Sequence, residues 1–185
     1  MKRLATAIAT TALTLALGAQ GVAAADPPSP PPLPAPALAV LAPAPAPPAK
    51  KIVVSLSQEK LFTYENGVLT NQTIVTTGGP QTRTPIGAFS IIGKRSNFYM
   101  TSPWPEDDWR WYEPAWVNHA LLFEWTGYFV HDAPWRHNFG PGSNAQFGTA
   151  GGDFTGTHGC VNVPLLFERP LFTWADIGTP VLIQP

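Results

Sequence analysis

The pattern of apolar and polar residues changes near Lys50. Beyond that residue, short runs rich in β-branched and aromatic side chains are separated by glycine, proline, asparagine and serine. Runs of this length and composition are typical of β-strands. The sequence therefore predicts a mostly β domain, with strands over residues 52–57, 60–64, 68–77, 87–92, 116–125 and 128–131.

Two turn signals and one helical pattern complete the predicted elements. Asn66-Gly67 and Thr126-Gly127 each separate two predicted strands, so each indicates a β-hairpin. Residues 164–176 have helix-like apolar spacing, and Pro170 is expected to break or kink that helix. The aromatic residues expected in the core are Phe89, Trp116, Phe123, Trp125 and Phe129.

The residues before the predicted domain resemble an export signal and a spacer. Residues 1–25 combine a positive start, an apolar run of 14 residues and a small-residue cleavage site, which predicts a signal peptide. That run is shorter than the ~20 residues a membrane span needs, although an uncleaved anchor is the alternative. Residues 26–50 hold 11 of the 22 prolines and predict a polyproline spacer or a disordered segment. The predicted domain is 51–185, in a secreted protein of the periplasm or cell wall.

Charge and composition narrow the classes of partner. The formal net charge is -1 and the isoelectric point is near 6.4, whereas proteins that bind nucleic acid normally present a basic face. We therefore expect no nucleic acid, and no membrane contact beyond the export signal. The four histidines and single cysteine lack metal-ligand spacing. We expect neither a metal nor another cofactor.

The single cysteine, Cys160, is the first candidate for a functional residue. A lone cysteine in an exported protein is a buried apolar residue, an intermolecular partner or a reactive thiol. Its neighbours Gly159 and His158 favour a nucleophile, which must be ionised and reachable to react. In an extended segment His158 and Cys160 lie ~6.5 Å apart along the chain, so the base comes from elsewhere.

His131 is the best candidate for that base. It stands at the end of a predicted strand and is followed by Asp132, Ala133, Pro134 and Trp135. A histidine at a strand end is well placed to line a cleft, although a lone histidine is more often structural. The other candidate bases are His119 and His137.

Several segments together resemble the L,D-transpeptidase catalytic domain, also called the YkuD domain. HDAPW at 131–135 is followed by THGCVN at 157–162, and RTPIGAF at 83–89 and IGTPVLI at 177–183 match further family elements. The resemblance extends from about Lys51 to Ile183. It implies a β-sandwich or barrel with one or two short helices.

The resemblance also implies a reaction on peptidoglycan stem peptides. Cys160 would attack the third stem residue of a tetrapeptide donor, expel D-alanine and form a thioester, which an acceptor amine would convert to a 3→3 cross-link. Water as acceptor would give L,D-carboxypeptidase activity, and carbapenems would acylate the same sulfur. His131 would act as base, with His158 in support. By the same resemblance, the oxyanion or orienting residues are Gly159, Asp132 and Thr157, and the substrate-binding residues are Asn162, Trp135, Arg136 and Tyr112.

The sequence departs from the family pattern at three places. The loop between His131 and Thr157 is longer than usual, which leaves His137 as an alternative base. Asp132 stands where several members have serine. Asn162 stands where other branches have arginine, so Arg136 is a candidate substitute for a contact with a substrate carboxylate.

The sequence is also compatible with other interpretations of residues 102–113 and of the function. The aromatic and acidic residues 102–113 form either a lid over the site or a surface loop packed on the sheet. A sortase-like transpeptidase lacks the His-Gly-Cys order, and in NlpC/P60 hydrolases the cysteine precedes the histidine. From another class, a non-catalytic wall-binding module would keep the fold without the reaction.

Overall fold

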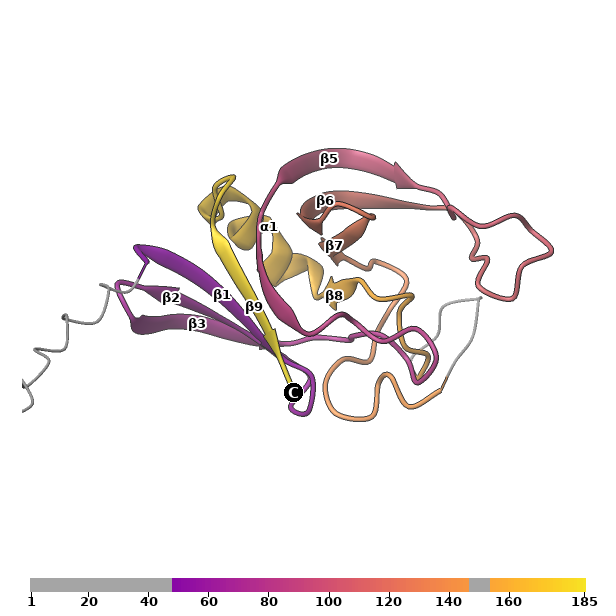
Figure 1. The fold of residues 1–185 in the computed structure, drawn as a ribbon, viewed down its shortest axis with the longest axis horizontal. Coiled ribbons are helices and arrows are strands. Elements are labelled where there is room, and N and C mark those ends of the chain that lie inside the picture. Colours follow the sequence, from indigo (N-terminus) through magenta and orange to yellow (C-terminus); the bar gives the residue numbers. More distant parts are fainter. Residues whose placement is uncertain (1–47, 147–153) are drawn as a thin grey trace, which may run out of the picture. The chain divides into compact units, whose positions relative to one another are not determined.

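The computed structural model describes residues 48–146 and 154–185. The predicted signal peptide and most of the predicted spacer lie outside these residues. Within them, no helix is both long and apolar enough to cross a membrane. Two β-sheets and one helix make up the described domain (Figure 1), which confirms the mostly β prediction.

The first sheet has the strand order β3-β2-β1-β9-β4. The turn between β2 and β3 is Asn66-Gly67, and both residues have positive φ, 50° and 84°. A two-residue turn with positive φ at both positions matches the right-handed twist of a hairpin, so the predicted hairpin is confirmed. The strands of this sheet are β1 (Lys50–Ser55), β2 (Lys60–Glu65), β3 (Val68–Ile74), β4 (Gly87–Ser90) and β9 (Pro180–Gln184).

The second sheet has the order β5-β6-β7-β8, with β8 parallel to β7. Its edge strand β5 was not predicted, because it contains a polar run, Lys94 to Asn97, and its alternation is interrupted at Asn97, which has a φ of 47°. The three-residue β8 was also missed, since such a short run carries little pattern. The strands are β5 (Gly93–Met100), β6 (Ala115–Glu124), β7 (Tyr128–Asp132) and β8 (Val161–Val163).

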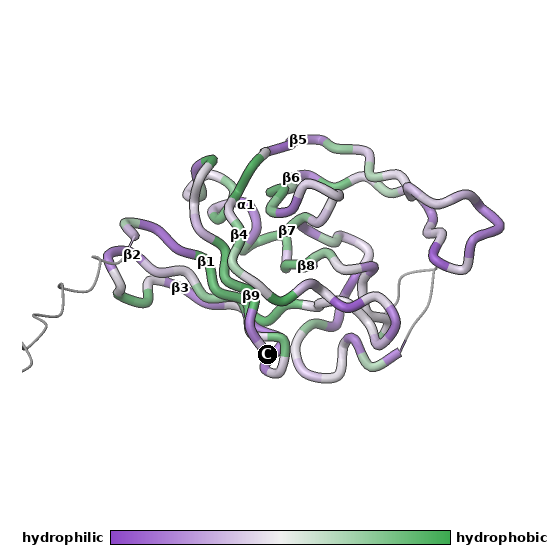
Figure 2. Tube along the Cα trace, viewed as in Figure 1, coloured by the Kyte–Doolittle hydropathy of each residue, from purple (hydrophilic) through white to green (hydrophobic). Residues whose placement is uncertain are grey.

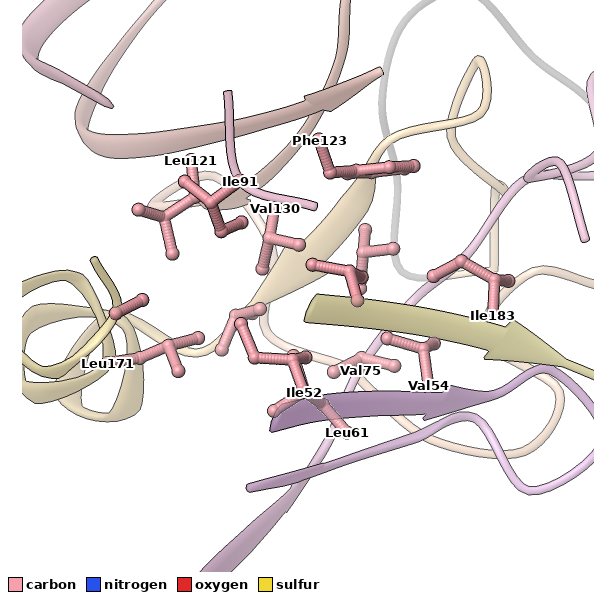
Figure 3. Close-up of a cluster of buried hydrophobic side chains, with 14 residues drawn as sticks. Ile52, Val54, Leu61, Val75, Ile91, Leu121, Phe123, Val130, Leu171 and Ile183 are labelled. Atoms are coloured by element: carbon pink, nitrogen blue, oxygen red, sulfur yellow. The ribbon is translucent and has the colours of Figure 1, made fainter. Parts of the chain in front are cut away.

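The main hydrophobic core lies between the sheets and the helix. β1 and β9 carry hydrophobic stretches (Figure 2), and residues of both strands belong to the buried core cluster. Ile52 of β1, Leu121 of β6 and Leu171 of the helix belong to one cluster of fully buried side chains (Figure 3). Burial of one such side chain contributes about 1.5–3 kcal/mol, so this cluster fixes the second sheet against the first.

The predicted aromatic core is only partly correct. Phe123 is buried, and Phe89 and Phe129 pack against the buried clusters. Trp116 and Trp125, however, are 62% and 82% exposed. Trp116 alternates with the buried Val117 and so faces out, where its ring contacts that of Tyr99, while Trp125 lies in the β6–β7 turn.

The helix α1 (Leu165–Trp174) follows Pro164 and contains Pro170. Of the two predicted effects of Pro170, a break or a kink, the break is wrong, because the helix continues for one more turn. Leu171 and Ala175 beyond the proline are buried in the core, and Ala175 N–H donates to the Leu171 carbonyl at 2.8 Å. Packing of that last turn offsets the hydrogen bond that proline removes.

Candidate active site

Strand alternation places the predicted site residues on one face of the second sheet. Val130 and Val161 are adjacent on β7 and β8 and point into the main core. Successive side chains of a strand point to opposite faces, so His131 and its neighbour Asn162 face away from that core. Cys160, just before β8, lies on the same side and packs against a second, smaller cluster.

A cavity of about 450 Å³ opens on this face. Cys160 and His131 both line it, together with Trp104, Tyr112 and Tyr128. The structure therefore brings the predicted nucleophile and the predicted base into one cavity from two adjacent strands.

The Cys160 thiol is half-buried in the cavity wall. The backbone N–H of Phe129 donates to its Sγ at 3.4 Å. Burial raises the pKa of this thiol to about 11, although the Phe129 N–H opposes the shift. Burial thus favours the neutral thiol over the ionised sulfur expected from the sequence, so a nucleophilic role for Cys160 would need a base to take its proton.

His131 is oriented by the backbone. Its Nδ1–H donates to the carbonyl oxygen of Asp132 at 2.7 Å. A carbonyl can only accept, so Nδ1 carries the proton and Nε2 presents a lone pair. Burial lowers the pKa of His131, against the opposing charge of Asp132. A neutral imidazole with a free Nε2 is the form a general base requires.

The carboxylate of Asp132 is fully buried and holds the end of β7 against β6. It accepts hydrogen bonds from the backbone N–H groups of Asn118 and His119 and from Asn118 Nδ2, at 3.1, 2.7 and 2.8 Å. The Asp132 side chain therefore fixes its own backbone, and the carbonyl of that backbone orients His131. This is how an aspartate at this position supports the histidine.

The turn before Cys160 is closed by Thr157. Its hydroxyl donates to the Cys160 carbonyl at 2.6 Å and accepts the Gly159 N–H at 3.0 Å. Its own N–H donates to the carbonyl of Thr77 at 2.9 Å. The Gly159 amide, which the family resemblance offers as an oxyanion donor, is therefore already engaged in this geometry, and the Cys160 amide is the neighbouring candidate donor.

Gly159 is required here by an aromatic contact as well as by its backbone. Its φ is 113°, and a Cβ at this position would lie 2.1 Å from Cε1 of Tyr128. Tyr128, which the sequence analysis did not single out, thus forms the wall beside the nucleophile. A spacing of three residues on a strand places Tyr128 and His131 on opposite faces, so the sequence carried no signal for this contact.

His158 packs among aromatic rings and is half-buried. Its ring centroid lies 5.0 Å from that of Tyr112 and 5.9 Å from that of Trp104. Burial lowers the pKa of His158. Trp104 and Tyr112 belong to the 102–113 segment, so part of this segment forms a wall of the cavity.

The comparisons with known proteins agree with this geometry. The family model of the L,D-transpeptidase catalytic domain (YkuD) matches residues 49–183. The chain belongs to this L,D-transpeptidase family. It is 28% identical over 110 residues to the probable L,D-transpeptidase 3 of Mycobacterium tuberculosis, and 25% identical over 134 residues to L,D-transpeptidase 1 of the same species. These matches cover 58% and 70% of this chain but only 36% and 48% of the relatives.

Solved structures show the same fold. The NMR structure of the catalytic domain of the E. faecium L,D-transpeptidase has a TM-score of 0.58 and 28% identity, covering 72% of this chain and 95% of that one. The L,D-transpeptidase LdtMt1 in complex with imipenem has a TM-score of 0.60 and 25% identity, covering 73% and 58% of the two chains. The chain is thus similar to an L,D-transpeptidase that binds a carbapenem.

In this L,D-transpeptidase domain, most of the other predicted residues also reach the cavity. Trp135, Arg136 and Asn162 line it, whereas His137 is exposed and does not. Arg136 is buried and its Nη2–H donates to the carbonyl of Thr155 at 2.7 Å. This placement favours His131 over His137 as the base.

Two buried glutamates of the L,D-transpeptidase domain went unnoticed in the sequence. Glu59 accepts hydrogen bonds from the N–H and hydroxyl of Thr77 and, at 2.8 Å, from Asn144 Nδ2. Glu168 of α1 is fully buried, and the charge of Asp132 is near enough to raise its pKa. Neither position carries a sequence signal, because glutamate is normally exposed. Within the described part of the chain, no group of three or more histidine, cysteine, aspartate or glutamate residues is placed to hold a metal ion.

Proposed function

We propose that this protein is a cysteine L,D-transpeptidase that acts on peptidoglycan stem peptides. The observation that carries the proposal is the placement of Cys160 and His131 on one face of adjacent strands, in a single cavity. Membership of the L,D-transpeptidase family supports the same reaction class. Export to the periplasm or cell wall, where such stem peptides lie, is part of the proposal.

The proposed reaction begins with a neutral thiol and a neutral imidazole. His131 Nε2 takes the thiol proton as Cys160 Sγ attacks the carbonyl carbon of the third stem residue, because a thiol with a pKa near 11 is otherwise un-ionised at neutral pH. The amide C–N bond then breaks, the imidazolium returns its proton to the leaving D-alanine nitrogen, and a thioester remains. The Cys160 backbone N–H is the proposed donor to the oxyanion.

The second half of the reaction uses an amine from a neighbouring stem. Its nitrogen attacks the thioester carbonyl, a 3→3 amide bond forms and the C–S bond breaks. His131 takes a proton from the amine and returns it to sulfur. The Arg136 guanidinium, which lines the cavity, is the proposed contact for a substrate carboxylate in place of the arginine that other branches have at position 162.

Acylation by a carbapenem tests the proposal directly. Imipenem occupies the related LdtMt1 in its complex, so we expect the wild-type protein to gain the mass of one imipenem, measured by intact-protein mass spectrometry. The Cys160→Ala variant should remain unmodified. An unchanged wild-type mass after prolonged incubation would count against the proposed function.

A further inference from the structure

In the described part of the chain, the cavity is lined by one acidic and one strongly basic side chain. Among the described residues that line it, Glu113 is the carboxylate and Arg136 the guanidinium. Arg136 is buried and bonded to the Thr155 carbonyl, whereas Glu113 is exposed. The lining therefore presents one accessible negative charge to a ligand.

Glu113 also differs from the other acidic residues nearby. Within residues 48–146 and 154–185, no cation lies within ion-pair distance of its carboxylate. Asp108 is paired with Arg110 at 2.6 Å. Glu106 and Asp107 are exposed and do not line the cavity. Glu113 is thus the acidic residue of this segment that both faces the cavity and lacks a partner of opposite charge among the described residues.

The position of Glu113 is fixed by its two neighbours in the chain. Tyr112 donates its hydroxyl to the carbonyl of Thr101 at 2.9 Å, and its ring lies against that of His158. Pro114 restricts the backbone on the other side and also lines the cavity. The backbone of Glu113 is therefore held beside the cavity, within reach of a ligand bound there.

An anion at this position suits one partner of the proposed reaction. The donor carbonyl is uncharged, and the leaving group carries a carboxylate that Glu113 would repel. The acceptor is a primary amine, which is an ammonium ion at neutral pH. Attraction between unit charges is stronger in a partly enclosed cavity than in bulk water.

We infer that Glu113 is a specificity-determining residue that recruits the ammonium group of the acceptor, in preference to water. This inference rests on the proposed function. The bound ammonium loses one proton to solvent, the amine nitrogen attacks the thioester carbon, and the C–N bond forms as the C–S bond breaks. His131 takes the second proton and passes it to Cys160 Sγ. Glu113 thereby favours cross-linking over hydrolysis without changing the chemistry.

The test measures how one acyl-enzyme partitions between two acceptors. The donor is a tetrapeptide whose N-terminal and side-chain amines are both acetylated, so that neither donor amine can act as acceptor, and the added acceptor is Nα-acetyl-lysine amide. The ratio of aminolysis to hydrolysis products, followed by liquid chromatography and mass spectrometry, is independent of the acylation rate. We expect Glu113→Gln to lower this ratio about fivefold, as for a partly exposed ion pair.

Three controls make the result specific to charge. Glu106→Gln, on the same segment but outside the cavity lining, should leave the ratio unchanged. Hydroxylamine, which is mostly uncharged at neutral pH, should react equally with Glu113→Gln and wild type. Added salt should lower the wild-type ratio for the cationic acceptor, a measurement that needs no variant.

The outcomes separate this inference from the proposed function. An unchanged ratio in Glu113→Gln, or an equal fall with hydroxylamine, overturns the inference while the acyl-enzyme still forms. Absence of any acyl-enzyme on the wild-type protein overturns the proposed function and the inference with it.

Discussion

Gly159 stands between the nucleophile and an aromatic wall, in a backbone conformation that side chains rarely adopt. Two constraints act on Gly159: its φ of 113°, and the contact that an added Cβ would make with the ring of Tyr128. The two constraints can be tested separately, because the first concerns only the backbone of Gly159. Gly159 directly precedes Cys160, so the backbone conformation of Gly159 helps to position Cys160 in the cavity wall. A Cβ added at Gly159 would therefore displace the turn that holds the Cys160 sulfur.

Replacing Gly159 by alanine tests that placement. We expect Gly159→Ala to destabilise the fold by about 1–3 kcal/mol, from the strained φ, and to slow acylation at least tenfold, since the turn must shift away from Tyr128. Gly178→Ala is the matched control, because Gly178 has a φ of 91° but open space at its Cβ. Urea unfolding and imipenem acylation rates check both effects. Equal acylation rates in the two variants would contradict the role of the aromatic contact.

The pH dependence of acylation reports on His131. Burial lowers its pKa below 6.5, and a base works only when neutral, so the rate should rise with pH through a midpoint below 6.5. Asp132→Asn removes a charge that raises this pKa, so it should move the midpoint further down. Imipenem acylation between pH 4 and 8 measures both midpoints.

The comparison of two histidine variants completes that test. His131→Ala should slow acylation by about 10²–10⁴, the usual contribution of a general base, while His137→Ala should match wild type. Retained acylation in the first variant and loss in the second would reassign the base to His137.

At the scale of elements, α1 lies against β6 and β7 and buries Glu168 behind the site. Neither carboxyl oxygen of Glu168 has a hydrogen-bond partner among the described residues. Burial, reinforced by the charge of Asp132, raises its pKa well above the ordinary value. The packing of the helix therefore favours the neutral form of this acid.

We expect Glu168→Met to stabilise the protein at pH 8 by about 1–3 kcal/mol, since burying an unpaired polar group is costly. Because the pKa of Glu168 is raised in the folded state, its contribution to stability is complete below the unfolded pKa of 4.5 and is lost as pH rises. The gain in the variant should therefore shrink at pH 5. Thermal unfolding at both pH values measures it, with Glu168→Gln as a neutral polar comparison. Lower stability of Glu168→Met at both values would show that the carboxyl is favourably held.

Prediction from sequence succeeded where local signals agreed with tertiary packing. The Asn66-Gly67 turn depends on neighbouring residues alone, so the pattern identified it. The predicted strand end at His131 lies one residue before the end of β7 at Asp132. Strand β5 and the part of α1 beyond Pro170 depend on packing partners far away in the chain. The local sequence pattern therefore did not predict β5 and allowed a break at Pro170. The raised pKa of Cys160 also could not be predicted, because it depends on burial that no motif records.

At the scale of the whole domain, Glu59 links the first sheet to the active-site turn. Its carboxylate holds Thr77, and the Thr77 carbonyl accepts the N–H of Thr157. Asn144, from the segment after β7, bonds to the same carboxylate. One buried acid thus joins three distant segments, so its protonation affects the stability of all of them.

Burial raises the pKa of Glu59 to about 7, although its hydrogen bonds with Thr77 oppose the shift. The unfolded value is near 4.5, so its contribution to stability is complete below that value and is lost as pH rises toward 7. Relative to Glu59→Gln, the wild-type free energy of unfolding should fall by up to about 1.4 kcal/mol per pH unit in this window. Urea unfolding at pH 4.5, 5.5, 6.5 and 7.5 measures the difference. A difference that stays constant with pH would mean that Glu59 is ionised in the folded protein, and that the three segments are held by a charged group.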